Sequence, residues 1–403
     1  MRYDQTIIYT GNFSIENMNA AGKRVFANAL IMQKLGFHMV MIGIDTQDTN
    51  SNDILSTGSE LDGIDVYHYP GKMFAKSRSN YIAFYNEFEK LLRNKQWNVR
   101  AIIGYNSPSI APFIGKVLGY CHKNDIKYIT DVADWLIVDS NNPVFRILRQ
   151  FDITLKNAYY SNKSDGVIAI SSWLADYYKR KVDNVIIVPP LAIKDVEKKP
   201  VVNEIPIIVY AGIPFRPGAV MNDPSAMKDR FDLACELLLK AKITDVPFVF
   251  HVYGFTRDQI LNSVPSLKKT IDNLGNQIFF HGLSSMETVQ AAVGAADYTI
   301  LVREQNRMTM AGFPTKVSES ITCGTPIITT RTSDIEKYLP EGNGVFFIDV
   351  KSMEQAGEKV VWLLSMSKED RRKQKVSTNR IKCFSTDSYL ETMKGFFEEL
   401  SLL

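Results

Sequence analysis

Short apolar runs alternate with helical segments along almost the whole chain. In the first half, runs rich in β-branched and aromatic residues occupy 6–11, 38–45, 64–70, 99–106, 127–134, 166–171 and 185–190. Segments with helical periodicity, such as 21–35 and 81–92, fill the gaps between them. Strands that alternate with helices form mostly parallel sheets with helices on both faces. The pattern therefore predicts an α/β fold.

A charged, proline-containing segment without apolar periodicity interrupts this alternation between residues 192 and 206. Strand patterns then restart at 206–214, 248–255, 276–283, 296–303, 325–330 and 344–349. A chain of 403 residues is long enough for two domains. We expect an N-terminal α/β domain at 1–192, a linker at 193–206 and a C-terminal α/β domain at 207–385. An amphipathic helix is expected at 386–403.

The overall composition narrows the class of protein. The apolar fraction of 45% and the charged fraction of 23% are ordinary for a globular protein, and a net charge of +3 is too weak to indicate nucleic-acid binding. The sequence has no run of 18 apolar residues, so no membrane-spanning helix is expected. The N-terminus lacks the organisation of a signal peptide. The cysteines lack metal-ligand spacing and suggest a reduced, cytoplasmic protein without a metal centre; they are Cys121, Cys235, Cys323 and Cys383.

The segment from Asp297 to Thr330 concentrates polar residues between two apolar strands. A buried-strand pattern stops at Arg303, a polar loop follows, and a short helix begins near Pro314 and Thr315. Proline suits a first helical turn, and Thr315 is the expected N-cap. Ligands of open α/β sheets bind where the strands end, and a helix start at that edge suits phosphate. We therefore expect a phosphate site here.

This helix places Lys316, Glu319 and Ser320 on one face and Val317 and Ile321 on the opposite, core-facing side. A lysine beside a diphosphate and a carboxylate beside a ribose diol would clamp a nucleotide. The same spacing also fits a Lys–Glu pair on a solvated helix face, so the residue types alone leave both interpretations open.

The run AGFPTKVSESITCGTPIIT resembles the donor-site signature of glycosyltransferase family 4, whose members have the GT-B fold. That fold consists of two Rossmann-like domains whose parallel sheets face each other across a cleft, and its last helix commonly packs back on the first domain. The resemblance therefore implies that 1–192 and 207–385 are Rossmann-like and that the helix at 386–403 packs on the first domain. The second glutamate of the signature matches Glu319, whereas Ala311 stands in place of the first, as in a Gly-Phe-Pro-Thr-Lys variant of the superfamily. The resemblance implies a donor site that includes Gly312, Phe313, Pro314, Thr315, Lys316 and Glu319. Near the missing carboxylate lie Arg303, Asn306 and Arg307.

Two other segments of the second half resemble elements of the same family. The stretches around Arg216 and Lys228 resemble the element whose arginine and lysine hold the donor phosphates, and positive charge there would stabilise a leaving diphosphate. Solvated loop cations are the alternative interpretation. Gly282 follows a strand at the position that resembles the docking site of the nucleotide base in the family. A glycine there would allow the base to approach the backbone closely.

The first half offers an expected acceptor side. The loop between Gly11 and Gly22 resembles the family's opening motif, which borders the acceptor and the donor diphosphate, although an ordinary βα turn explains the same glycines. Asp131 and Asp134 lie where a strand ends, at the edge expected to meet ligands. Either carboxylate could orient an acceptor hydroxyl or act as a base, and an N-cap role is the alternative.

The resemblance implies a glycosyltransferase that moves a sugar from a nucleotide sugar, expected to be UDP-linked, to a hydroxyl of a saccharide or lipid-linked saccharide in cell-envelope polysaccharide synthesis. It also implies retention of the anomeric configuration and no cofactor. Lys228, with Arg216 or Arg303, would stabilise the departing diphosphate, and Glu319 would hold the ribose. The alternatives are a sugar-nucleotide 2-epimerase, for which no evident set of acids with a histidine exists, and a non-catalytic GT-B partner protein, which the missing glutamate at Ala311 suggests.

The first half is also slightly basic. Residues 1–199 contain 24 Lys and Arg against 20 Asp and Glu, and residues 145–151 alternate cationic and apolar side chains. Peripheral contact with anionic lipid at the inner face of a membrane is one hypothesis, and solvated helix faces are the other. The basic residues concerned are Lys72, Lys76, Arg78, Arg146, Arg149 and Lys156.

Overall fold

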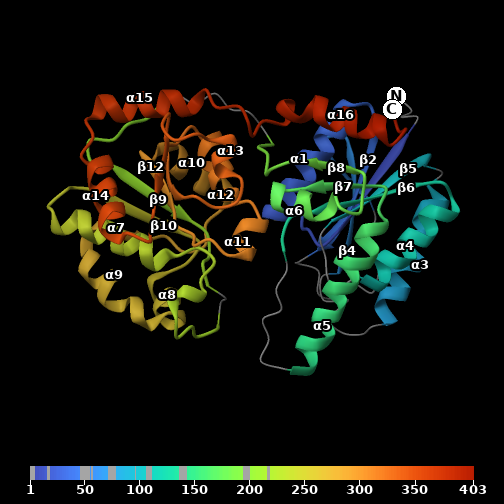
Figure 1. The fold of residues 1–403 in the computed structure, drawn as a ribbon, viewed down its shortest axis with the longest axis horizontal. Coiled ribbons are helices and arrows are strands. Elements are labelled where there is room, and N and C mark those ends of the chain that lie inside the picture. The colour runs from blue at the N-terminus through green and yellow to red at the C-terminus, as the bar shows by residue number, and fades with distance from the viewer. Residues whose placement is uncertain are drawn as a thin grey trace. The chain divides into compact units, whose positions relative to one another are not determined.

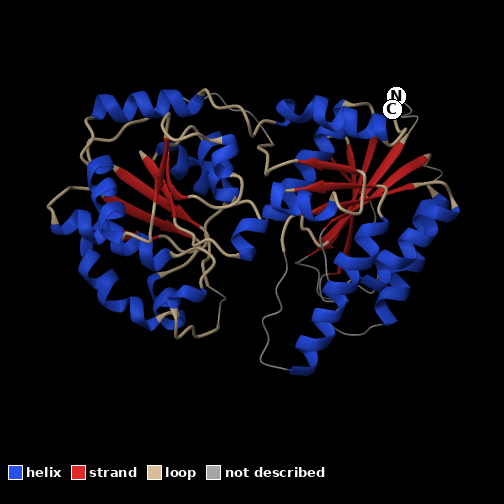
Figure 2. Cartoon of the chain, viewed as in Figure 1, coloured by secondary structure: helices blue, strands red, loops and turns tan. Residues whose placement is uncertain are grey.

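The computed structural model describes residues 5–15, 19–45, 55, 58–70, 79–95, 97–105, 111–135, 143–193, 200–215 and 218–403. Four predicted site or surface residues, Lys72, Lys76, Arg78 and Arg216, lie outside this part of the chain. The chain divides into two compact units. Unit 1 comprises Met1–Ile193, Ala311–Phe313 and Ser385–Leu403, and unit 2 comprises Lys194–Met310 and Pro314–Phe384. Each unit is an α/β structure (Figure 1; Figure 2), which confirms the predicted fold class.

Unit 1 contains an eight-stranded sheet with the order β3-β4-β2-β1-β5-β6-β7-β8. Neighbouring strands are parallel except for β3 and β4. The edge strand β3 has no counterpart among the predicted strands, because its three residues, Ser-Glu-Leu, are largely exposed and show no apolar pattern. The strands are β1 (Thr6–Gly11), β2 (His38–Asp45), β3 (Ser59–Leu61), β4 (Ile64–Pro70), β5 (Val99–Tyr105), β6 (Lys127–Val132), β7 (Gly166–Ala169) and β8 (Asn184–Ile187).

Helices cover both faces of this sheet. On one face, Ile8 of β1 packs in a cluster with Phe88 and Phe113 from two neighbouring helices. On the other face, the last helix of the chain packs against the first helix and β8, and the rings of Phe37 and Phe397 lie 5.1 Å apart. The helices of unit 1 are α1 (Ala20–Lys34), α3 (Ser79–Asn94), α4 (Ala111–Lys123), α5 (Pro143–Leu155), α6 (Ser172–Tyr178) and α16 (Leu390–Glu399).

Unit 2 contains a six-stranded parallel sheet with the order β11-β10-β9-β12-β13-β14. All six strands coincide with apolar runs from which strands were expected. Their alternation sends Ile208 and Tyr210 to the larger core and Val209 to a smaller cluster on the opposite face. The strands are β9 (Ile207–Ala211), β10 (Val249–Tyr253), β11 (Ile278–Phe280), β12 (Tyr298–Leu301), β13 (Ile327–Thr330) and β14 (Val345–Ile348).

The helices that follow these strands complete unit 2. They are α7 (Phe231–Ile243), α8 (Arg257–Ser263), α9 (Lys268–Leu274), α10 (Met286–Ala295), α11 (Arg307–Ala311), α12 (Thr315–Thr322), α13 (Ile335–Tyr338), α14 (Met353–Leu364) and α15 (Lys368–Asn379). Within the described ranges, no helix combines the length and the apolar character that a membrane crossing requires.

Candidate functional site

The strand order of unit 2 creates a topological switch point between β9 and β12. From β9 the chain builds β10 and β11 on one side, and it then returns to build β12, β13 and β14 on the other. In open parallel sheets, ligands bind in the crevice at the carboxyl ends of two such strands. Gly212 follows β9, Arg303 follows β12, and α12 begins further along the same connection. These segments therefore border the expected ligand site of unit 2.

Four side chains meet at this switch point and are termed here the Asp229 cluster: Asp229, Arg303, Lys316 and Tyr210. Arg303 Nε donates to Asp229 Oδ1 at 2.6 Å, and Lys316 Nζ donates to Asp229 Oδ2 at 2.5 Å. The Tyr210 hydroxyl donates to Asp229 Oδ2 at 3.2 Å. Asp229 and Arg303 are buried, whereas the Lys316 side chain is 22% exposed. One carboxylate thus holds two cations, and the cluster keeps one net positive charge.

The protonation states in this cluster follow from burial and charge. Burial would raise the pKa of the Asp229 carboxyl, but the charges of Lys316 and Arg303 outweigh it and hold that pKa well below its usual range. Burial and then the charge of Asp229 raise the pKa of Tyr210 well above its usual value. Asp229 is therefore ionised and Tyr210 is neutral at physiological pH. Cations held at fixed positions in a partly buried site suit a phosphate-bearing anion.

Two glycines make room for the cluster. Gly212 has a φ of +148°, and a Cβ at this position would lie 2.3 Å from Lys316 Cε. Gly254, directly after β10, has a φ of +113°, and its Cβ would lie 2.6 Å from the Gly212 carbonyl oxygen. A side chain at either position would push aside the lysine or the loop beneath it. The approach of Lys316 to Asp229 therefore depends on both glycines.

The start of α12 differs from the sequence prediction. Pro314 occupies the N-cap with extended backbone and Thr315 is the first helical residue, so the predicted Thr315 N-cap is wrong. Proline already sets the φ of the cap position, which places the threonine hydroxyl inside the first turn. No side chain caps this helix start. Its backbone N–H groups therefore suit an anion, immediately before Lys316.

The two faces of α12 are only partly as expected. Val317 and Ile321 are buried in the core, as predicted. Ser320, expected beside Lys316 and Glu319, is instead buried, and its hydroxyl lies 2.5 Å from that of Thr299 on β12. Its small polar side chain ties the helix to the sheet. Lys316 and Glu319, both half-buried, are left as the pair available to a ligand.

The three residues expected near the missing glutamate have separate surroundings. Arg303 belongs to the Asp229 cluster. Asn306 directly precedes α11, and its Oδ1 accepts a hydrogen bond from Thr309 N at 3.0 Å, whereas Arg307 is exposed. Ala311, where the signature has its first glutamate, is completely buried. Gly312 and Phe313 next to it are buried as well.

Lys228 and Gly282 are both close to the Asp229 cluster, Lys228 in sequence and Gly282 through a backbone hydrogen bond. Lys228 is half-buried and directly precedes Asp229, so the lysine of the family pattern is adjacent to the residue that organises the cluster. Gly282 has a φ of +69°, and its carbonyl accepts a hydrogen bond from Gly254 N at 2.8 Å. The ring of His281 stacks on Tyr253 with centroids 4.4 Å apart. Gly282 is thus linked through Gly254 to the loop that adjoins Lys316.

In unit 1 the switch point lies between β1 and β5. Gly11 ends β1 with a φ of +153°, and a Cβ there would lie 2.6 Å from the Tyr105 carbonyl oxygen at the end of β5. In the first turn of α1, a Cβ on Gly22 would lie 2.1 Å from the Ser14 carbonyl oxygen. Close packing of the turn thus requires both glycines, which is the ordinary interpretation of the motif. A role at the donor diphosphate stays a prediction.

Asp131, a predicted catalytic residue, is completely buried in unit 1. Its carboxylate accepts hydrogen bonds from Tyr9 OH and from Arg24, whose Nη2 lies 2.7 Å from Oδ1. Arg24 Nη1 also donates to the Val188 carbonyl oxygen at 2.6 Å. A carboxylate with these partners and no exposed surface is poorly placed to take a proton from an acceptor hydroxyl. Asp134, three residues on and half-buried, is the more accessible of the two predicted carboxylates.

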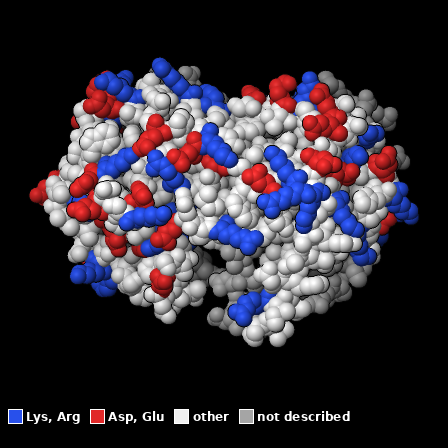
Figure 3. All heavy atoms as spheres, in the orientation of Figure 1, with Lys and Arg blue, Asp and Glu red and all other residues white. Residues whose placement is uncertain are grey.

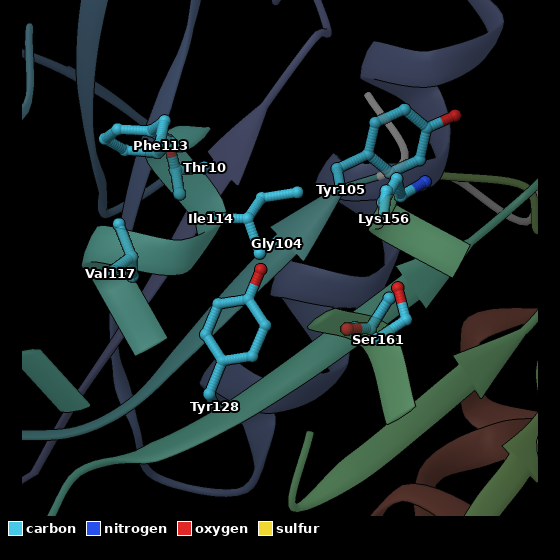
Figure 4. A pocket seen from close by; sticks show the side chains of 10 residues that line it. Thr10, Gly104, Tyr105, Phe113, Ile114, Val117, Tyr128, Lys156 and Ser161 are labelled. Carbon is cyan, nitrogen blue, oxygen red and sulfur yellow. The ribbon is translucent and has the colours of Figure 1, made fainter. Parts of the chain in front are cut away.

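A small pocket beside these strand ends contains a buried lysine (Figure 4). Lys156 comes from the π-helical turn at Lys156–Tyr160 that follows α5, and it is 2% exposed. Burial lowers the pKa of its ammonium group to about 8, although nearby carboxylates, Asp152 first among them, partly oppose this shift. Lys156 therefore does not belong to the basic surface with which its sequence pattern associated it. Other residues that line the pocket are Thr10, Tyr105, Tyr128, Thr130 and Ser161.

Across the described part of the chain, no group of three or more His, Cys, Asp or Glu side chains is arranged to hold a metal ion. All four cysteines are free thiols.

Comparison with known proteins agrees with this geometry. Residues 229–380, which begin at Asp229 and include α12, match the family Glycosyl transferases group 1. Residues 229–380 are thus similar to a glycosyltransferase domain, and the fold of the chain is the GT-B fold, as the sequence resemblance predicted. No curated protein sequence matches closely enough to count as a relative.

Several solved structures share the fold along the whole chain. Sucrose-phosphate synthase from Thermosynechococcus elongatus aligns with a TM-score of 0.67 and 12% identity over 98% of this chain and 99% of its own. The catalytic domain of starch synthase IV from Arabidopsis thaliana, bound to ADP and acarbose, aligns with a TM-score of 0.64, 11% identity and coverages of 98% and 99%. A trehalose-6-phosphate structure from E. coli, bound with UDP-2-fluoro glucose, aligns with a TM-score of 0.62 and 8% identity over 97% of this chain and 98% of its own.

Sequence analysis missed the residue around which the site is organised. Asp229 directly follows Lys228 in the stretch that resembles the phosphate-binding element, but its partners Arg303 and Lys316 lie 74 and 87 residues further along the chain. The sequence signal for this role was the position of the Asp229 carboxylate between two basic residues, Lys228 and Arg230, of a phosphate-binding element. Tyr210, Gly212 and Gly254 offered no signal beyond their positions at strand ends.

Proposed function

We propose that this protein transfers a sugar from a UDP-sugar to a hydroxyl of a saccharide or lipid-linked saccharide acceptor. The observation that carries the proposal is the Asp229 cluster, which holds Lys316 and Arg303 beside the uncapped start of α12 inside the group 1 domain. Two of the structures that share the fold are bound to ADP or UDP-2-fluoro glucose, which supports a nucleotide-linked donor.

In this proposal each part of the site has a separate role. The N–H groups at the start of α12 and the Lys316 ammonium bind the diphosphate, and Glu319 binds the ribose hydroxyls. Lys316 and Arg303 stabilise the negative charge that develops as the sugar leaves the diphosphate. Asp229 holds both cations in place, so little reorganisation is needed as that charge appears. Lys228 adds positive charge next to the cluster.

The remaining features of the proposal come from the family resemblance. Unit 1 binds the acceptor, with Asp134 as the carboxylate that orients its hydroxyl. The anomeric configuration is retained, no metal takes part, and the product belongs to cell-envelope polysaccharide made on the cytoplasmic side.

A thermal-shift screen without added metal tests the donor site, with UDP, GDP, ADP and CMP and their common sugar conjugates as ligands. A ligand at a hundred times its dissociation constant adds roughly 2.7 kcal/mol of apparent stability. We expect a selective shift with UDP and UDP-sugars that is lost in Lys316→Ala and in Glu319→Ala. Lys373→Ala serves as the control, because Lys373 is an exposed residue of α15 that pairs with Asp370 and lies outside the Asp229 cluster.

Two outcomes would contradict the proposal. If no nucleotide shifts the unfolding temperature, the donor site is wrong. If a UDP-sugar binds but is only converted to its epimer when no acceptor is present, the reaction is a 2-epimerisation and the transferase mechanism is wrong.

A further inference from the structure

Helix α5 exposes an unusual apolar stripe. Val144, Ile147, Leu148 and Phe151 are spaced i, i+3, i+4 and i+7, so they lie along one side of the helix. Their side chains are 65%, 67%, 46% and 66% exposed, whereas Ile153 on the opposite side is buried. Helices of globular proteins normally turn such a stripe to the core. Here the core is covered by the other side of α5, and the stripe is left to solvent.

The charges of α5 are mostly positive and lie off the stripe. Arg146 is exposed and Arg149 is half-buried, and Asp152 is the only acidic residue of α5. In Figure 1, α5 extends beyond the neighbouring helices of unit 1, and the same tip in Figure 3 shows blue but no red atoms. An acidic partner surface therefore fits this helix better than a basic one.

An exposed aromatic–cation pair follows α5 in the sequence. Tyr159 is 48% exposed, and Lys163 Nζ lies 4.1 Å from the centre of its ring and 2.8 Å from its hydroxyl oxygen. Tyrosine and lysine side chains with an apolar body and a polar end are typical of the headgroup level of a bilayer.

The size of the stripe separates a lipid surface from a protein partner. Four side chains of this kind present on the order of 400 Å² of surface, half of the roughly 800 Å² that each partner buries in a stable protein complex. A narrow apolar stripe with arginines elsewhere on the helix is instead sufficient for an interfacial helix, which inserts only its apolar side below the headgroups.

We infer that α5 is a membrane-docking helix, which places the apolar stripe of unit 1 in the surface of an anionic bilayer. Val144, Ile147, Leu148 and Phe151 enter the acyl boundary, and Arg146, Arg149 and Lys163 stay at the phosphate level. This inference does not depend on the donor chemistry proposed above, because all of its residues lie in unit 1 and none belongs to the Asp229 cluster.

Co-sedimentation of the full chain with vesicles tests the inference. The vesicles are phosphatidylcholine alone or phosphatidylcholine with 30% phosphatidylglycerol, each at low salt and at high salt. We expect binding to the anionic vesicles that falls at high salt. The double substitution Ile147→Gln and Phe151→Gln should weaken it at least tenfold, because both exposed side chains lose their insertion energy. Ile243→Gln is the matched control, since this residue is 73% exposed at the end of α7 in unit 2.

A second variant separates the electrostatic part. Arg146→Gln with Arg149→Gln should lower binding to anionic vesicles about fivefold per charge and leave the weak binding to neutral vesicles unchanged. Circular dichroism and thermal unfolding check that each variant is folded. Wild-type protein that stays in the supernatant with anionic vesicles overturns the inference. So does a stripe variant that sediments like wild type. A concentration-dependent dimer that the stripe variant abolishes would assign the stripe to a second copy of the chain instead.

Discussion

Replacement of Lys156 by methionine should stabilise unit 1 by an amount that depends on pH. The lysine is completely buried beside the strand ends, and burial lowers the pKa of its ammonium from an ordinary value near 10.5 to about 8. Methionine has a similar shape but no charge. The substitution therefore removes the cost of burying a proton-binding group while filling most of the same space (Figure 4).

The magnitude follows from the shift. Because the pKa is lower in the folded state, the unfolded chain binds more protons between about pH 8 and pH 10.5, so stability from this group rises with pH across that window. A shift of this size corresponds to roughly 3 kcal/mol, all of which opposes folding at pH 7. Lys156→Met should thus be about 3 kcal/mol more stable than wild type at pH 7, and this advantage should shrink to about 1 kcal/mol at pH 10.

Urea unfolding at pH 7 and pH 10 measures this difference. Three of the four tryptophans, among them Trp135 and Trp173, lie in unit 1, so a Trp362→Phe background makes fluorescence report on that unit alone. Lys163→Met, at an exposed position, is the control and should show no change with pH. A stability difference for Lys156→Met that is equal at both pH values would refute the reasoning. It would mean that Asp152 and its neighbours fully compensate the buried ammonium.

Three other substitutions have expected outcomes. Gly212→Ala should weaken UDP-sugar binding at least tenfold by calorimetry, because its Cβ displaces the lysine of the proposed donor site. Gly342→Ala, also at a positive φ (+95°) but with open space around its Cβ, should not. Arg24→Met should destabilise unit 1 by roughly 3–5 kcal/mol in urea unfolding, because it removes the charge that pairs with the buried Asp131 carboxylate. Adding Asp131→Leu to this variant should restore most of the lost stability. If it restores none, the unpaired carboxylate is not the cause of the loss. Phe396→Ala should cost unit 1 about 3–5 kcal/mol and leave the unfolding of unit 2 unchanged; an equal loss in both units would contradict the assignment of α16.

Features set by local sequence were the predictable ones. The parallel strands and most helices could be predicted from apolar periodicity, because a strand that is buried on both faces shows a continuous apolar run in its own sequence. The N-cap of α12 was missed because proline and threonine both suit a helix start, and only the backbone decides between them. Asp229 and Lys156 could not be placed, because their environments are formed by residues far apart in the chain. The basic residues that the sequence placed together have different surroundings, because Lys156 is buried in the turn after α5, whereas the apolar stripe of α5 is exposed.

The last helix has a consequence for the order in which the protein matures on the ribosome. Residues 385–403 belong to unit 1, although the main part of that unit ends at residue 193. Gly166 of β7 lies directly under α16, where a Cβ would be 2.5 Å from the Phe396 ring. While the intervening residues are being synthesised, this side of the sheet lacks its cover, and its apolar surface faces solvent or a chaperone. Unit 2 can fold before unit 1 is complete, so chains truncated after residue 384 should contain a folded unit 2 and an unfinished unit 1.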